Sequence, residues 1–117
     1  MHVEKGSIEI EIANYMSYFN KRHLGRGPKD IKVKMVDDTL IYFIKGLMTQ
    51  MEKSIIETDE GKRVVLEARK IFVDNTRNER VSEFERIIGL KVIEHYTSWD
   101  LENDAAVGVV VFENKIR

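Results

Sequence analysis

Residues 24–30 read LGRGPKD, and the pattern of the sequence differs on either side of them. A helical spacing of apolar residues precedes this stretch, and an alternation typical of a β-strand follows it. Gly25 can adopt the positive φ that often ends a helix. Pro28, the only proline, cannot continue a helix and favours an extended conformation at Gly27. The stretch therefore predicts the boundary between a helix and a strand.

The segment before this boundary has the spacing of an amphipathic helix. Its apolar residues recur every three or four positions, at Ile8, Ile12, Met16 and Phe19. Glutamates lie early in the segment and a Lys-Arg-His run lies late, which is the order that the helix dipole favours. We therefore expect a helix from about Ser7 to Leu24, ended by Gly25.

The segment after the boundary predicts a β-hairpin. Residues 31–36 alternate between apolar side chains and side chains that are mostly lysine, as in a strand with one buried face. A polar turn at residues 37–39 leads to Leu40–Ile44, which is apolar on both faces. Such a strand is expected at the centre of a sheet or covered on both sides. Gly46 then ends the hairpin.

The middle of the chain carries two helix-start signals. Thr49 and Glu52 have the spacing of a capping box, which predicts a short helix through Thr58. Thr58 is itself suited to cap a further helix. Apolar residues of helical spacing continue from there to Gly89, which would cap the end, but residues 74–78 are polar all round. One long helix with an exposed middle and two helices with a break both fit this pattern.

Two further strands close the sequence. We expect them at Leu90–Tyr96 and Val107–Phe112, joined by an acidic loop, Thr97–Asp104, that contains Trp99. The element order is then α-β-β-α-α-β-β, which is that of a ferredoxin-like fold whose first strand has moved to the C-terminus. The expected fold class is α+β with two layers, in which helices cover one face of a four-stranded antiparallel sheet. We expect one domain over residues 1–117, with its core at about residues 5–113.

The second and fourth strands are apolar on both faces, so the sheet face away from the helices should not be wholly bare. Residues 105–112 would promote aggregation if they lay at an open edge. We expect a homodimer or higher oligomer, a partner protein, or the Trp99 loop to cover this surface.

Composition limits the classes of function. The 117 residues carry a net charge of −1, are 43% hydrophobic and 33% charged, and include no cysteine. Disulfides, thiolate metal sites and a thiol nucleophile are therefore excluded. The longest apolar run, residues 105–112, is too short to span a bilayer, and no signal-peptide core is present. We expect a cytoplasmic protein without a transmembrane segment, peripheral to a membrane only through a partner.

Positive charge is concentrated between residues 21 and 34. Six basic residues lie there against one acidic residue: Lys21, Arg22, Arg26, Lys29, Lys32 and Lys34. The main-chain amides of Gly25 and Gly27 could bind an anion, with Arg26 and Lys29 completing a phosphate or carboxylate site. The segment lacks the ending of a P-loop, and a helix end with solvated charges is the favoured explanation, with an anion or acidic-partner site as the alternative. Both readings stay open.

Nucleic acid is a less favoured partner for the same segment. Lys32 and Lys34 share one strand face, and Tyr42 or Phe43 is expected near them. Basic and aromatic groups on a four-stranded sheet can bind single-stranded RNA. The aromatic-rich strand signature of such proteins is missing, and the chain is not basic overall, so nucleic-acid binding is not expected.

Metal and catalytic sites are not predicted. Asp100, Glu102 and Asp104 alternate like the start of a calcium loop, but the glycine and the bidentate glutamate of that loop are absent, so a solvated turn is expected. The histidines show no ligand spacing. His95, on a predicted strand, is expected to be a hydrogen-bonded structural residue. No serine stands in a nucleophile-elbow pattern.

Several stretches together resemble the MpsC family, whose members are named as components of a bacterial Na+-translocating, membrane potential-generating system. The stretches are LGRGPK at 24–29, VDD at 36–38, GLMTQME at 46–52, residues 61–69, GLKV at 89–92 and the last strand to Phe112. They extend over nearly the whole chain, from about Glu4 to Glu113. The sequence departs from the family at Gln50, where proline is frequent, and around Trp99.

The resemblance implies an accessory protein of a membrane transport system that is linked to inorganic carbon supply and membrane potential. It implies no catalytic residues and no cofactor. Arg26, Lys29 and Arg69 are the positions where we would expect a site shared by the family.

Three classes of function follow from these observations. An interaction protein would present the basic Gly25–Lys34 region to an acidic surface of a partner, such as a membrane transporter subunit. A regulatory module would hold a small anion, a phosphate ester or a carboxylate such as bicarbonate, at the Gly25–Lys29 loop. An enzyme would need a converging acid–base pair, and the sequence predicts none. We favour the non-catalytic interaction protein, with the anion-binding module as the alternative.

Overall fold

The computed structural model describes residues 5–116, so the expected domain ends at residues 1–4 and 117 lie outside the described residues. Between them the chain forms α1 (Lys5–Leu24), β1 (Asp30–Val36), β2 (Thr39–Lys45), α2 (Gln50–Ile55), α3 (Asp59–Ile88), β3 (Val92–Asp100) and β4 (Ala105–Phe112). The molecule is elongated, with principal extents of 51 × 24 × 21 Å. The predicted order of elements is confirmed.

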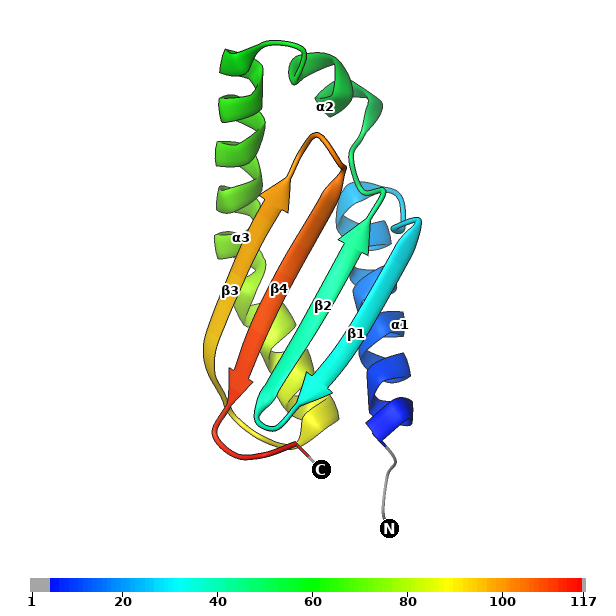
Figure 1. The fold of residues 1–117 in the computed structure, drawn as a ribbon, viewed down its shortest axis with the longest axis vertical. Coiled ribbons are helices and arrows are strands. Elements are labelled where there is room, and N and C mark those ends of the chain that lie inside the picture. Colours follow the sequence, from blue (N-terminus) through cyan, green and yellow to red (C-terminus); the bar gives the residue numbers. More distant parts are fainter. Residues whose placement is uncertain (1–4, 117) are drawn as a thin grey trace.

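The strands form a four-stranded antiparallel sheet in the order β1-β2-β4-β3 (Figure 1). The last strand therefore lies between β2 and β3, in the place that the first strand of a ferredoxin-like sheet occupies. Both doubly apolar strands, β2 and β4, are central, and β1 and β3 form the edges. The α+β class and the permuted order are confirmed, and residues 105–112 are not an open edge.

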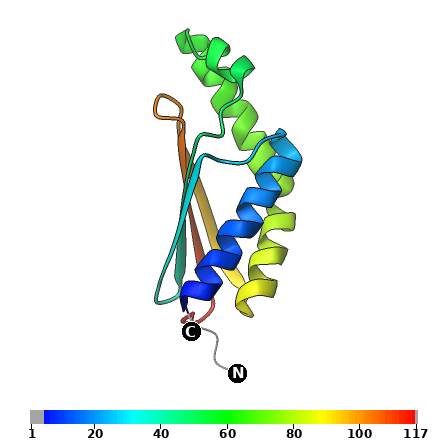
Figure 2. The same cartoon turned by 90° about the vertical axis from the view of Figure 1, so that its right-hand side faces the viewer.

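Helices α1 and α3 lie on the same side of the sheet (Figure 2). The core fills the space between these layers, because every second strand residue points toward the helices. Its buried members are Ile8, Ile12, Met16, Val33, Met35, Leu40, Tyr42, Ile44, Leu47, Phe84, Val110 and Phe112. The opposite face of the sheet is covered by no described segment (Figure 2).

Helix α3 is one continuous helix of 30 residues, which resolves the alternative between one helix and two. Its polar middle stays helical because its side chains bond to the helix itself. The Thr76 hydroxyl donates to the main-chain oxygen of Phe72 at 2.7 Å, and Arg80 donates to that of Val73 at 2.8 Å. At a rise of about 1.5 Å per residue α3 is about 45 Å long, and its first turns extend beyond the sheet together with α2 (Figure 1).

The predicted capping residues of the helices are confirmed. Gly25 and Gly89 have φ values of 79° and 80°, and both end a helix. Thr49 and Glu52 form the capping box of α2, and the Thr58 hydroxyl accepts from Gly61 at the start of α3. Helix α2 is shorter than expected and ends at Ile55.

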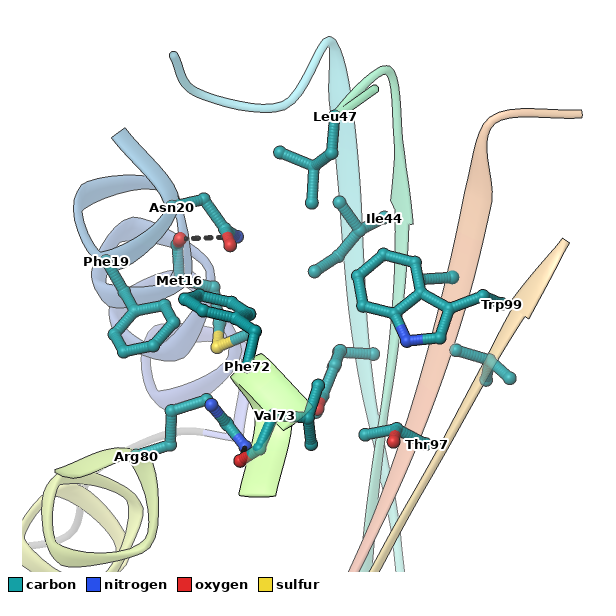
Figure 3. Close-up of a pocket in the computed structure, with 13 residues that line it drawn as sticks. Met16, Phe19, Asn20, Ile44, Leu47, Phe72, Val73, Arg80, Thr97 and Trp99 are labelled. Carbon is teal, nitrogen blue, oxygen red and sulfur yellow. Dashed lines mark hydrogen bonds between the residues drawn. The ribbon is translucent and has the colours of Figure 1, made fainter. Parts of the chain in front are cut away.

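The predicted boundaries of the third strand and the following loop were wrong. β3 continues to Asp100, so Trp99 lies on the strand and the connection to β4 is only residues 101–104. The strand continues because Trp99 pairs with Ala106 of β4 and packs against the core. The Trp99 side chain points toward the helices (Figure 3), so it does not cover the open face of the sheet.

Candidate functional site

The structure divides the basic segment between two surfaces. Lys21 and Lys29 are exposed near the connection between α1 and β1, whereas Lys32 and Lys34 are exposed on the open face of the sheet. In the described chain no carboxylate forms an ion pair with any of these four lysines. Arg22 differs from them, because it pairs with Glu79 of α3 at 2.8 Å. The segment is therefore not one continuous site.

Two polar groups of the loop at residues 25–29 form hydrogen bonds that stabilise the fold. The Gly25 amide donates to the Lys21 main-chain oxygen at 2.9 Å, which completes the end of α1. Arg26 Nη1 donates to the main-chain oxygen of Met48 at 3.3 Å. An anion at this loop would therefore depend on Gly27 and Lys29, with the remaining donors of Arg26.

Lys29 lies directly over Gly46. A Cβ atom built on Gly46 would come within 2.5 Å of Lys29 Cγ, and Gly46 has a φ of 79°. Glycine is thus required there for both space and backbone conformation. The contact places the exposed ammonium group of Lys29 beside the start of the β2–α2 connection.

Arg69 is buried and serves a structural role. Its Nε donates to Glu52 Oε2 at 2.7 Å, its Nη2 donates to Glu52 Oε1, and its side chain is only 5% exposed. Its guanidinium lies 4.6 Å from the centroid of the Trp99 ring, and Nη2 is 3.5 Å from the main-chain oxygen of Leu47. Arg69 therefore ties α2 and the β2–α2 connection to α3 and β3.

The carboxylate of Glu52 is stabilised in its charged form. Burial raises the pKa of Glu52, but hydrogen bonds from Arg69 and Thr49 outweigh that effect and leave the pKa below its ordinary value. Glu52 is the same residue that closes the capping box, so one carboxylate caps α2 and pairs with α3.

Asp104 is a structural residue that sequence reasoning missed. Its Oδ1 accepts from the amides of Leu47 and Met48 at 3.1 and 2.9 Å, and its main-chain oxygen accepts from Gly46 at 2.9 Å. The expectation of a solvated turn was wrong at this residue. Asp104 has a φ of 49°, a conformation that aspartate tolerates, and aspartate at this place in the sequence is typical of a turn. The sequence gives no sign, however, that the Asp104 carboxylate accepts from the distant amides of Leu47 and Met48.

The three positions expected from the family resemblance thus converge on one connection. Arg26 and Arg69 both reach the main chain of residues 47–48, and Lys29 covers Gly46. Lys32 and Lys34 do not take part. The convergence explains these positions as supports of the β2–α2 connection, with the Lys29 ammonium group left exposed.

A small cavity lies between α1, α3 and the sheet (Figure 3). Its volume is about 30 Å³, and most of its walls are apolar, including Met16, Phe19 and Trp99. A water molecule occupies about 30 Å³ of liquid, so the cavity fits no larger ligand. Arg80, which lines it, is buried and donates to Thr76 and Val73.

His95 forms the expected hydrogen bond, and it has no carboxylate partner. Its Nε2 lies 3.0 Å from the Tyr42 hydroxyl. Burial, with the positive charges of Arg80 and Arg77, lowers the pKa of His95 to about 4, and burial raises the pKa of Tyr42 to about 12. The pair is neutral at physiological pH and buried, which suits a structural role and not proton transfer with a substrate.

Residues 5–116 contain neither a metal-binding cluster nor a membrane-spanning helix. No group of three or more His, Asp or Glu side chains there is placed to hold a metal ion. No helix in the described part is long and apolar enough to cross a membrane.

Comparison with known proteins agrees with this geometry. Residues 4–114 match the family described as Na+-translocating membrane potential-generating system (MpsC). The chain belongs to the MpsC family. Among its relatives is the uncharacterised protein YbcI of Bacillus subtilis (strain 168), which is 30% identical over 97% of this chain and 90% of the relative. YrhF of the same strain, also uncharacterised, is 26% identical over 91% of this chain and 88% of the relative.

No solved structure matches the chain. Membership of the MpsC family connects the protein with a membrane potential-generating system. The named relatives add no activity, since both are uncharacterised.

Proposed function

We propose that this MpsC protein is a non-catalytic accessory component of a membrane potential-generating system and binds an acidic surface of a partner protein through its basic loop. We define the basic loop as residues 21–29, of which Lys21 and Lys29 are the exposed cations that form no ion pair with a described residue. A membrane transporter subunit, linked to inorganic carbon supply, is the partner that the family membership favours.

The observation that carries the proposal is the exposure of these two lysines. Other basic residues of the segment are engaged: Arg22 pairs with Glu79, and Arg26 bonds to Met48. Lys21 and Lys29 remain available near the connection between α1 and β1. Surface lysines without a carboxylate attract an acidic partner and speed its association, in a salt-dependent manner.

The arrangement of buried polar groups supports a role without catalysis. Arg69 pairs with Glu52, and the Asp104 carboxylate accepts hydrogen bonds from two main-chain amides. His95 bonds to the Tyr42 hydroxyl. These groups stabilise the fold, and none of them lines the hollow of about 890 Å³ beside Gly89 or the hollow of about 420 Å³ beside Val64.

The test is affinity capture from native membranes with wild-type protein and the variant Lys21→Glu/Lys29→Glu. Juxtaposed like charges at an interface cost several kcal/mol, so recovery of the partner should fall at least tenfold. Lys53→Glu/Lys70→Glu is the matched control, because it makes the same charge change at exposed positions of α2 and α3. Arg26 is left intact, since its loss would also disturb the bond to Met48.

Equal recovery of the same membrane proteins by both variants would contradict the proposal. If the partner is retained and only binding of bicarbonate or a phosphate ester is lost in Lys21→Glu/Lys29→Glu, the loop is an anion site instead. Calorimetric titration of wild-type protein with each anion distinguishes that outcome.

A further inference from the structure

The open face of the sheet is an apolar band with a charged border on each side. Leu40, Tyr42 and Val110 point into the core, so the alternate residues of the central strands point outward. These outward residues are Ile41 and Phe43 of β2 and Val107, Val109 and Val111 of β4. Tyr96 and Val36, each 59% exposed, extend the band onto the edge strands, and Phe43 is 49% exposed.

Hydrogen-bond register aligns these residues in rows across the sheet. One row runs Lys34, Ile41, Val109, Tyr96, and the next runs Lys32, Phe43, Val107, Ser98. Each row therefore begins with a lysine on β1 and passes over apolar side chains to β3. Figure 1 views this face, with α1 and α3 behind it.

The border on β3 carries the opposite charge. Glu94 and Asp100 are exposed outward positions on that strand, at the two ends of the pairing with β4. Neither forms an ion pair with a described residue. On β1 the outward charges are Lys32, Lys34 and Asp30, and Asp30 is paired in register with the outward Lys45 of β2. The face therefore has a net positive charge along β1 and the neighbouring end of β2, an apolar middle and a negative charge along β3.

The face is large enough for a specific interface. Strands about 4.8 Å apart and about seven residues long, with a rise of about 3.4 Å per residue, give a face of roughly 19 × 24 Å. The projected area is about 450 Å², and side-chain relief makes the accessible area larger. Specific interfaces bury at least about 500 Å² per partner.

We propose that a second copy of this chain packs on this face, related by a two-fold axis parallel to the strands. Such an axis places β1 of one copy over β3 of the other and keeps the rows aligned, so Lys34 lies one row from Glu94 of the other copy. Asp30 lies over Asp100, with Lys45 beside it in the same row. A two-fold axis in the sheet plane but perpendicular to the strands would place β1 over β1 and oppose lysine with lysine. The charge pattern therefore selects one arrangement.

Self-association fits this face better than other occupants do. A uniformly acidic partner or a nucleic acid would meet Lys32 and Lys34 favourably but would be repelled by Glu94 and Asp100. A second copy satisfies both borders at once and covers the apolar band. The arrangement uses no residue of the basic loop, so Lys21 and Lys29 stay accessible in the dimer.

The test measures molar mass by light scattering at micromolar concentration. Wild-type protein should have twice the chain mass of 13.7 kDa. Phe43→Glu should be monomeric, because it places a charge within the apolar band. Val64→Glu is the matched control, since Val64 is 51% exposed on α3, away from the sheet, and this variant should remain dimeric.

A charge exchange tests the direction of the two-fold axis. Lys34→Glu and Glu94→Lys should each weaken the dimer about tenfold, because each change occurs twice per dimer and creates like-charge contacts. The double variant Lys34→Glu/Glu94→Lys should regain most of the lost affinity, since the exchanged borders again face each other.

Circular dichroism should show the same fold for all variants, because the substituted side chains are exposed. A monomeric wild-type protein, or a dimer unaffected by Phe43→Glu, would overturn the proposal. A double variant no tighter than the single variants would overturn the axis and with it the arrangement. Binding of a single-stranded RNA oligonucleotide by monomeric wild-type protein, lost in Phe43→Glu, would assign the face to nucleic acid instead.

Discussion

Arg69→Met should detach α2 from the rest of the molecule. Helix α2 contributes no buried residue of its own, so the ion pair between Glu52 and Arg69 is its main attachment to α3. Methionine keeps much of the length and apolar contact of arginine but removes the charge and the donors. The Glu52 carboxylate, 16% exposed, would then lack its partner.

The size of the effect follows from burial. Removing one member of a buried ion pair costs about 3–5 kcal/mol. Because solvent reaches part of the Glu52 carboxylate, we expect the lower end, a decrease of about 3 kcal/mol in the free energy of unfolding. Arg63→Met provides the control, since Arg63 and Glu60 form an exposed pair at 3.8 Å and such pairs contribute about 0–1 kcal/mol.

Urea denaturation measures the global loss, and hydrogen exchange of the α2 amides measures the local opening. Amides of residues 50–55 should exchange faster in Arg69→Met, while those of β2 and β4 keep most of their protection. The double variant Glu52→Gln/Arg69→Met should lose less than the sum of the single variants, because no unpaired buried charge remains. Additive losses, or a loss below about 1 kcal/mol in Arg69→Met, would refute the reasoning.

Three further predictions concern buried contacts. Gly108→Ala should lower the free energy of unfolding by about 1–3 kcal/mol in urea denaturation, because its Cβ would lie 1.9 Å from the Tyr42 ring; wild-type stability would contradict this. Asp104→Ala should cost about 2 kcal/mol in the same assay and Asp104→Asn less, since asparagine keeps an acceptor for two amides and tolerates positive φ; equal losses would argue against the amide contacts. Between pH 6.5 and about 4, His95 binds a proton in the unfolded chain but not in the folded protein. The free energy of unfolding should therefore fall as the pH drops through this range, by about 2 kcal/mol after allowance for solvent screening. His95→Asn should remove that part of the pH dependence, and an unchanged pH profile would contradict the assignment.

Local sequence determined where the helices end and which chain segments form strands. Gly25, Gly89, Thr49 and Thr58 act on amides and carbonyls within about four residues, so their roles were readable without a structure. Alternation in the hairpins likewise indicated which side of each strand is buried. The order of elements, with apolar residues on both faces of the second and fourth strands, then placed those strands at the centre of the sheet.

Tertiary structure decided what the polar residues do. Arg69 lies 17 residues from Glu52, and Asp104 lies 56 residues from Met48, so no local pattern connects the members of either contact. The end of β3 also depends on tertiary packing, since the strand continues to Asp100 where the Trp99 side chain packs against the core. Long-range packing also decided which basic residues are engaged, since Arg22 pairs with Glu79 of α3 and Arg26 bonds to the main chain of Met48. These outcomes depend on which surfaces meet, and that is determined only when the whole chain packs.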